Sequence, residues 1–320
     1  MIEVKGLVKQ YGNHIAVDHL NFHIESGQIW GFLGPNGAGK STTMNIMTGY
    51  IAATEGDVKI NGFDIYEEPE KAKSSIGYLP EQPPVYMDMT PEEYLKFVAE
   101  LKKIPKKERK AAVEEAMEKT QIVHMRKRII RNLSKGYRQR VGLAQAILGN
   151  PKVIILDEPT VGLDPKQIIE IRDLIRDLAK NRTVILSTHI LAEVSAICDH
   201  VLIIDKGKLV ACDTTERLSG GKQKTTFIDV VVKAEKEKVK AVLDGIEGIT
   251  RYEIRQKEGE ELAISIESDA DEGIREKISY ELAVGGCPIL SMGVRQQSLE
   301  DIFLQLTEEE KEGTEDDSNL

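Results

Sequence analysis

The sequence has 320 residues, which is longer than one average domain and favours roughly two domains. Lys and Arg number 43 against 53 for Asp and Glu, so the net charge is −10 and the chain as a whole repels nucleic acid. No apolar run approaches the ~20 residues of a membrane span, and we see no secretory signal at the start. Three scattered cysteines (Cys198, Cys212 and Cys287) form no disulfide framework, so we expect a reducing, cytosolic compartment.

The first half of the chain changes from strand patterns to helix patterns. Residues 17–24 alternate between apolar and polar, and Asn61-Gly62 between alternating residues predicts a β-hairpin. From about residue 90, Thr90 precedes a run with helical periodicity, which returns over residues 111–120 and 134–148. We therefore expect a helical insertion near the middle of a strand-rich region.

The next segment alternates buried strands with a helix. Residues 153–156, 183–187 and 201–204 are short and almost wholly apolar, as is typical of buried parallel strands. Between them, Asp164-Pro165 opens a helix with one apolar face. This order predicts a layered α/β core.

A smaller module follows a polar linker at residues 219–224. The pattern beyond it is strand 226–232, helix 235–244, strands 249–256 and 261–267, helix 270–284 and strand 288–294. This β-α-β-β-α-β order predicts a ferredoxin-like α+β fold. We also expect an amphipathic helix at 298–306 and a disordered acidic tail. The predicted domains are residues 1–220, 225–306 and the tail, 307–320.

One octapeptide matches the phosphate-binding loop pattern G-x-x-x-x-G-K-S. A predicted strand at 29–33 precedes it and a predicted helix at 41–48 follows. Glycines let backbone N–H groups surround phosphates, and the helix adds its positive end. The lysine can bridge terminal phosphates, and the serine can ligate Mg²⁺. The residues of this candidate site are Gly34, Pro35, Asn36, Gly37, Ala38, Gly39, Lys40, Ser41 and Thr42.

Two carboxylates, Asp157 and Glu158, follow the predicted buried strand 153–156. Ligands of open α/β sheets bind at this end of the strands. Asp157 suits the Mg²⁺ shell, and Glu158 is placed to activate a water. Alone, such a pair is more often a helix cap or surface charge, but the phosphate loop upstream favours the functional interpretation.

These motifs, with Leu133-Ser134-Lys135-Gly136-Tyr137-Arg138-Gln139-Arg140 between them, resemble the ATP-binding cassette (ABC) ATPases over residues 1–220. The resemblance implies a phosphate-loop core with an antiparallel β subdomain and a helical subdomain at about 88–150. It also implies that Ser134, Lys135 and Gly136 meet the nucleotide bound by the other subunit of a dimer. This motif departs from the usual L-S-G-G-Q, because Lys135 replaces a glycine and Tyr137 the glutamine.

Four further positions match the family pattern. Tyr11 lies where the family stacks an aromatic ring on adenine, and Gln82 where it senses the γ-phosphate and Mg²⁺. Asp164 resembles the residue that communicates across the dimer, although it is also a good helix N-cap. His189 resembles the histidine that contacts the γ-phosphate, although a lone histidine is more often structural. The expected catalytic residues are therefore Glu158, His189 and Lys40, and the expected metal ligands are Ser41, Gln82 and Asp157.

The resemblance implies an ATP-hydrolysing subunit that uses ATP and Mg²⁺, dimerises on ATP and drives a separate multi-span permease. The C-terminal module and residues 297–303 resemble the exporter branch. We expect a homodimer or heterodimer at the inner face of the cell membrane, with no specific nucleic acid. Basic residues at 126–131 fit either a membrane-facing or a solvated surface.

Two other classes of protein could carry these motifs. A soluble ABC ATPase acting on ribosomes or nucleic acid usually carries two cassettes or a long coiled coil, and this sequence shows neither. A nucleotide-responsive binding module without catalysis would not need Glu158 and His189. The transporter subunit is therefore the favoured hypothesis.

Overall fold

The computed structural model describes residues 1–220, 226–257, 259, 261–269 and 273–295. The chain divides into two compact units, Met1–Thr215 and a second that begins at Glu216, and each is described by itself. Within the described residues no helix is both long and apolar enough to cross a bilayer.

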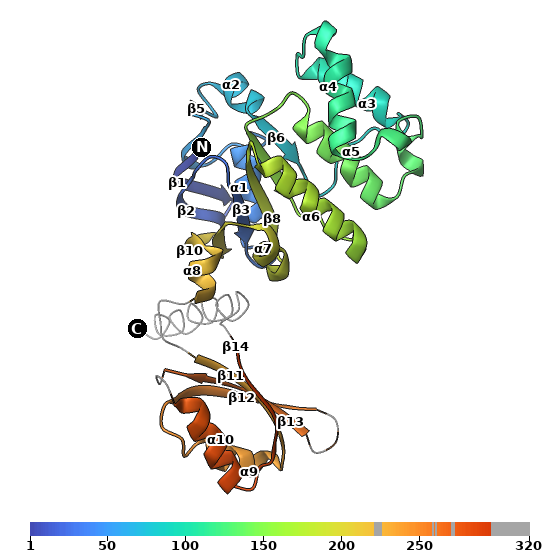
Figure 1. Cartoon of the computed structure of the whole chain (residues 1–320). Coiled ribbons are helices and arrows are strands. Elements are labelled where there is room, and N and C mark those ends of the chain that lie inside the picture. The colour runs from blue at the N-terminus through green and yellow to red at the C-terminus, as the bar shows by residue number, and fades with distance from the viewer. Residues whose placement is uncertain (221–225, 258, 260, 270–272, 296–320) are drawn as a thin grey trace. The chain divides into compact units, whose positions relative to one another are not determined.

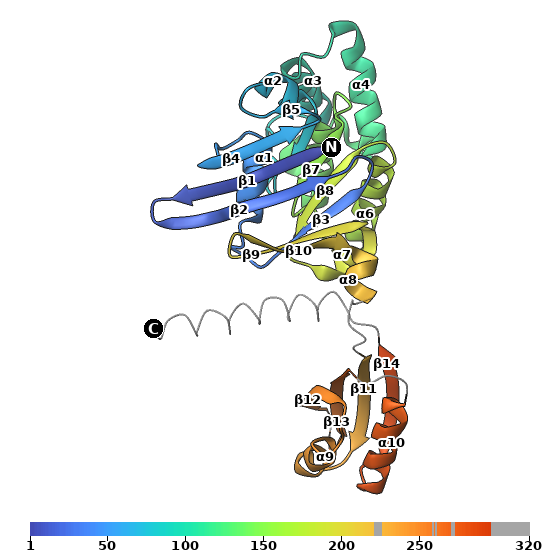
Figure 2. The ribbon, with the colours of Figure 1, turned by 90° about the vertical axis from the view of Figure 1, so that its left-hand side faces the viewer.

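An antiparallel sheet opens the first unit, with strand order β2-β1-β4-β5. Its strands are β1 (Ile2–Tyr11), β2 (His14–Ile24), β4 (Glu55–Ile60) and β5 (Phe63–Asp64). Figure 2 shows β4, β1 and β2 side by side. The predicted hairpin is confirmed: Asn61 and Gly62 both have positive φ (53° and 84°) between β4 and β5, as a tight turn of this type requires.

The second sheet of this unit is mostly parallel, with strand order β10-β9-β3-β8-β7-β6. Its strands are β3 (Ile29–Leu33), β6 (Ile76–Leu79), β7 (Val153–Asp157), β8 (Thr183–Thr188), β9 (His200–Asp205) and β10 (Lys208–Thr214). Only β10 runs antiparallel to its neighbour. The predicted buried strands are confirmed as β7, β8 and β9. The carboxyl ends of β7, β8 and β9 therefore lie at the same edge of this sheet as the carboxyl end of β3.

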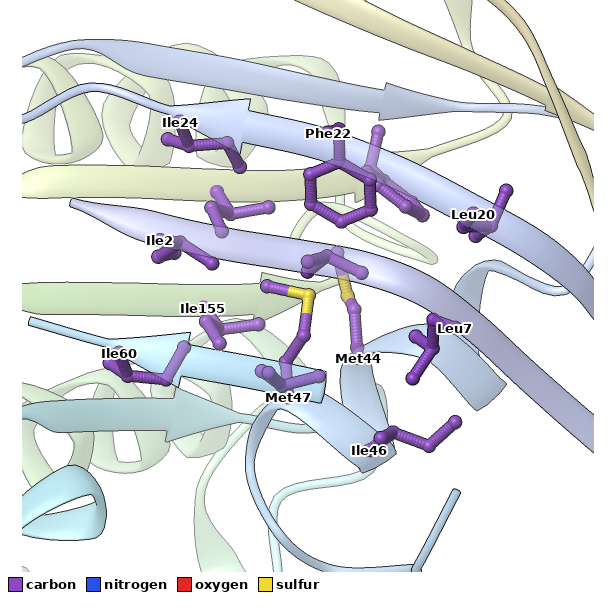
Figure 3. Packing of buried hydrophobic residues seen from close by; sticks show 14 of the residues in the cluster. Ile2, Leu7, Leu20, Phe22, Ile24, Met44, Ile46, Met47, Ile60 and Ile155 are labelled. Carbon is purple, nitrogen blue, oxygen red and sulfur yellow. The ribbon is translucent and has the colours of Figure 1, made fainter. Parts of the chain in front are cut away.

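Helix α1 (Lys40–Met47) packs in the core between the two sheets. Figure 3 shows Met44 and Met47 of this helix among Ile2 and Phe22 of the antiparallel sheet and Ile155 of β7. All but Phe22 are fully buried, and Phe22 is 7% exposed. Because α1 directly follows the phosphate loop, this packing fixes the loop to both sheets.

The predicted helical insertion lies between β6 and β7 and forms the green group in Figure 1. It contains α3 (Pro91–Leu101), α4 (Lys106–Lys119), the 3₁₀ turns η1 (Val123–Met125) and η2 (Ile130–Asn132), and α5 (Lys135–Ile147). The helix that was predicted after Thr90 is α3, and Thr90 and Glu93 form a capping box at its start. Lys102 ties the end of α3 to α5, because its Nζ donates to the carbonyls of Gln145 (2.9 Å) and Leu148 (2.8 Å).

Four other helices complete the description up to residue 220. They are α2 (Pro69–Ser74), α6 (Pro165–Ala179), α7 (Leu191–Ile197) and α8 (Thr215–Gly220). Asp164 caps α6 by accepting a hydrogen bond from the Gln167 N–H at 2.9 Å. Helix α7 packs closely on β3, where a Cβ added to Gly31 would lie 2.9 Å from a Val194 methyl. Only a glycine in β3 allows this approach.

The second unit has the predicted β-α-β-β-α-β order. Its elements are β11 (Thr226–Lys233), α9 (Lys236–Leu243), β12 (Ile249–Gln256), β13 (Glu261–Ser268), α10 (Ile274–Val284) and β14 (Ile289–Arg295). The strands form an antiparallel sheet in the order β12-β13-β11-β14, and α9 and α10 pack on the same buried face of it. The amphipathic helix expected at 298–306 and the tail at 307–320 lie outside the described residues.

Candidate active site

A cavity of about 580 Å³ lies beyond the carboxyl ends of β3, β7 and β8. The phosphate loop, the start of α1 and residues that follow β7 and β8 line it, although these segments are far apart in the sequence. The lining residues are Tyr11, His14, Ala16, Asn36, Gly37, Ala38, Gly39, Lys40, Ser41, Thr42, Glu81, Glu158, Val161 and His189. The structure therefore brings together most of the residues that the sequence singled out.

Two glycines of the loop are required by close backbone neighbours. A Cβ on Gly34 would lie 2.3 Å from the Ile204 carbonyl oxygen, and one on Gly39 would lie 2.4 Å from that of Ala16. Gly39 also has φ of 101°, a conformation that other residues rarely adopt. The loop is therefore enclosed by main-chain atoms of β2 and β9.

Lys40 is buried at the centre of this loop, with 6% of its surface exposed. Its Nζ donates to the carbonyls of Gly34 (2.8 Å) and Pro35 (3.1 Å). Burial lowers the pKa of this ammonium group, and the negative charges of Glu158 and Asp157 act in the opposite direction. A cation held this way is a strong partner for phosphate oxygens.

Asp157 ends β7 and is also buried. Its Oδ1 accepts hydrogen bonds from the Ser187 hydroxyl and from Ser41 Oγ, the latter at 3.4 Å. A carboxylate beside a hydroxyl offers the hard oxygen ligands that Mg²⁺ prefers. Two of the three predicted metal ligands, Ser41 and Asp157, are therefore adjacent and fit this ion.

Glu158 has a strained backbone with φ of 48°, which is uncommon for a residue other than glycine. Its N–H donates to the carbonyl (3.2 Å) and hydroxyl (3.3 Å) oxygens of Ser187, and these bonds hold the turn. The bend carries the side chain into the cavity lining.

The Glu158 carboxylate lies close to His189. Its Oε1 is 2.9 Å from His189 Nδ1, whereas the buried Oε2 has no hydrogen-bond partner in the described structure. Burial raises the pKa of Glu158, and the bond to His189 partly opposes this shift. A carboxylate with a raised pKa is a better proton acceptor near neutral pH, so Glu158 is suited to activate a water.

Tyr11 and Gln82, two further predicted residues, differ in whether they line the cavity. Tyr11 lies in the lining and is 49% exposed, with Lys9 Nζ 5.0 Å from its ring centroid. Gln82 is exposed and is not part of the lining, which its neighbour Glu81 joins instead. Sequence reasoning missed Ser187 as a site residue; the available signal was its place at the end of a predicted buried strand, two residues before His189.

The residues of the Leu133–Arg140 motif lie outside this cavity lining. Ser134 caps α5 through its hydroxyl, which accepts from the Tyr137 N–H at 3.4 Å. The buried Gly136 leaves room for the Gln167 side chain, whose oxygen would be 2.6 Å from an added Cβ. Lys135 Nζ would be 2.3 Å from a Cβ on Gly162, so its side chain lies against the loop before Asp164.

Known proteins are similar to this chain in sequence and in fold. Residues 17–161 match the family model described as ABC transporter. The bacitracin transport ATP-binding protein BcrA of Bacillus licheniformis is 35% identical over 308 residues, which cover 96% of this chain and 97% of that protein. The linearmycin resistance ATP-binding protein LnrL of Bacillus subtilis (strain 168) is 30% identical and covers 96% and 98%. A solved structure described as a dimeric bacterial ABC transporter cassette is 26% identical, with a TM-score of 0.62, and covers 67% of this chain and 98% of that one.

Proposed function

This chain belongs to the ATP-binding proteins of ABC transporters, a family of ATPases, and we propose that it powers export through a separate membrane-spanning partner. The observation that carries the catalytic part of the proposal is the Glu158–His189 pair, which lines the same cavity as Lys40 and the phosphate loop. A binding module without turnover would have no use for a partly buried carboxylate held at this position by an unusual backbone conformation.

In the proposed reaction, water attacks the γ-phosphate of ATP in line with the bond that breaks, and ADP leaves. Glu158 accepts the proton of the attacking water, and His189 holds both this carboxylate and the γ-phosphate. Lys40 and the N–H groups of residues 36–42 neutralise the phosphate oxygens. Tyr11, on the rim, stacks on adenine. Positioning and electrostatics therefore supply most of the rate.

Mg²⁺ fits the same proposal. Ser41 and Asp157 would hold it, and Gln82 would join them through a movement of the exposed segment after β6. When bound, the ion would supply positive charge against the negative charge that develops on the phosphate during the reaction. Lys40 would add a further positive charge from within the phosphate loop.

We also propose that two ATP-binding subunits enclose the nucleotide. Ser134 and the amides of Lys135 and Gly136 lie at the positive end of α5, a 13-residue helix, and suit a phosphate on physical grounds. They lie outside the cavity lining of their own chain, so they are free to serve the cavity of another. The dimeric cassette that this fold resembles supports this arrangement. The second subunit is either another copy or a relative, and we propose that Asp164, which caps α6, takes part in communication between the two.

Export and membrane attachment are supported by the relatives. BcrA and LnrL are named for bacitracin transport and linearmycin resistance, and this chain covers nearly the whole of both, the second unit included. We propose that the chain binds a multi-span permease at the cytoplasmic face of the cell membrane. The permease provides the transport path for the cargo.

The proposal is tested by purifying tagged Glu158→Gln protein from gently solubilised native membranes with MgATP. We expect a multi-span membrane protein to co-purify in a fixed ratio, because the variant keeps ATP bound. A matched purification with Lys40→Ala, which weakens ATP binding, controls for nucleotide dependence. Recovery only from the soluble fraction, together with ribosomes or nucleic acid, would contradict the transporter assignment.

A further inference from the structure

Glu193 is a buried carboxylate that the reaction described above does not use. It lies on α7, is 1% exposed and is not part of the cavity lining. Burying a glutamate costs free energy unless its oxygens find partners. Its contacts therefore indicate what the residue holds in place.

The Glu193 side chain completes a small hydrogen-bond network that involves both neighbours of His189 in the chain. Its Oε2 accepts a hydrogen bond from Thr188 Oγ1 at 3.0 Å, and the same Thr188 oxygen accepts from the Ile190 N–H at 3.0 Å. The Glu193 N–H in turn donates to the Ile190 carbonyl at 3.0 Å. Both neighbours of His189 are thus bound to Glu193, directly or through one hydroxyl.

We propose that Glu193 is a positioning residue for ATP hydrolysis, because it holds the turn that directs His189 toward Glu158. This inference rests on the role proposed for His189. The His189 side chain is 44% exposed, so packing alone does not orient it. Its direction is set by the backbone between Thr188 and Ile190, and Glu193 fixes that backbone on both sides.

The other oxygen of Glu193 faces helix α6. Its Oε1 has no hydrogen-bond partner in the described structure, and Arg172 Nη2 lies 4.0 Å away. Arg172 is on α6, whose first residue follows Asp164. Arg172 thus faces one oxygen of the Glu193 carboxylate, while the other oxygen accepts the hydrogen bond from the Thr188 hydroxyl.

The test measures steady-state ATP hydrolysis by the full-length chain, with ATP binding and thermal unfolding recorded for each variant. For Glu193→Ala we expect kcat to fall about 10- to 100-fold while KM changes less than about twofold, because misplacement affects turnover more than nucleotide binding. Thr188→Val, which keeps the shape but removes the hydroxyl, should give a similar loss. Thr188→Ser should restore most of the activity. Ser195→Ala, on the exposed side of α7, is the matched control and should keep wild-type turnover.

A His189→Ala background separates positioning from simple stabilisation. If Glu193 acts through His189, Glu193→Ala should cause almost no further loss of kcat in that background. An equal fold-loss in both backgrounds, or wild-type kcat for folded Thr188→Val, would overturn the inference while leaving the proposed function intact. Full turnover by His189→Ala alone would instead reject the role of His189 and, with it, this inference.

Discussion

The two units of the chain are both sheets covered by helices, yet they differ in what they bury. In the first unit, Lys40, Asp157, Arg140 and Glu193 are charged and less than a tenth exposed. Among the described residues of the second unit, Ser268 is the one polar side chain buried to this extent, and its hydroxyl donates to the Gly248 carbonyl at 2.6 Å.

Unpartnered buried polar atoms follow the same division. Glu158 Oε2, Thr160 Oγ1 and Glu193 Oε1 belong to the first unit, and the described part of the second unit contains no such atom. The first unit holds further atoms of this kind on Arg126, Arg172, Arg182 and His200, which lie outside the cavity lining. The first unit therefore tolerates buried polar groups both at the candidate site and away from it, whereas the described part of the second unit is packed almost wholly from apolar side chains.

The largest expected effect comes from the catalytic carboxylate of the first unit. Glu158→Gln should reduce phosphate release by about 10²- to 10⁴-fold, because the amide cannot accept a proton from water. ATP binding should be retained, since the phosphate loop is unchanged. Glu253→Gln, an exposed change in the second unit, is the control and should leave turnover unaltered. Near-normal phosphate release by Glu158→Gln would remove this residue from the role of base.

A pair of glycine substitutions compares the tolerance of the two units. Gly34→Ala places a methyl group 2.3 Å from the Ile204 carbonyl oxygen, so the loop must move, and a shift of about 1 Å can cost about 10²-fold in rate. Gly293→Ala, in the second unit, meets no atom within 4 Å. We expect ATP turnover to fall sharply in the first variant and to be kept in the second. Equal losses in both would argue that the second unit has a direct part in catalysis.

Shortening one buried side chain in each unit compares the stability of the two units. Ile278→Ala empties a fully buried position in the second unit and should cost about 2–5 kcal/mol of unfolding free energy. Trp30, the single tryptophan of the sequence, is buried in β3 and reports on the first unit alone. We therefore expect the circular-dichroism transition to shift in denaturant while the Trp30 fluorescence transition does not. Ile155→Ala, at a fully buried position of β7, should shift the fluorescence transition, and equal shifts for both variants would mean that the units unfold together.

The smallest expected effect is a displacement along the pH axis. Burial raises the Glu158 pKa, so turnover should fall with decreasing pH at values above those typical of a glutamate, as this group becomes protonated. The bond to His189 lowers that pKa, so any residual activity of His189→Ala should show its acid limb at higher pH than wild type. The pH dependence of kcat/KM measures both limbs. An unchanged limb in His189→Ala would show that another group controls it.

Sequence alone predicted long elements and motif-bearing turns well. The buried strands β7, β8 and β9 were recognised because a short, uninterrupted apolar run is typical of a strand that is buried on both faces. Helices α2, α7 and α8 were missed, since segments of six or seven residues hold too few turns to show a period. Strand β10 was missed as well, because it is half-exposed and lies at the sheet edge.

The residues of the candidate site were also predicted well where they belong to a local motif and poorly where they do not. Residues within a local motif, such as Lys40 and Asp157, were identified, and the structure places them together. Glu193 had no motif of its own, because its significance depends on a hydrogen bond to Thr188 and on an arginine from another helix. Glu81 joins the cavity in place of Gln82, an outcome decided by loop geometry that spacing does not encode.

The main-chain carbonyl oxygens that enclose the phosphate loop have a consequence for how mutations can change this site. Every residue carries the same main-chain oxygen, so substitutions at Ala16 or Ile204 leave the two carbonyl oxygens nearest to the loop in place. Substitutions on the rim around Tyr11 can therefore change which base the cavity accepts without moving the main-chain oxygens that enclose the phosphate loop.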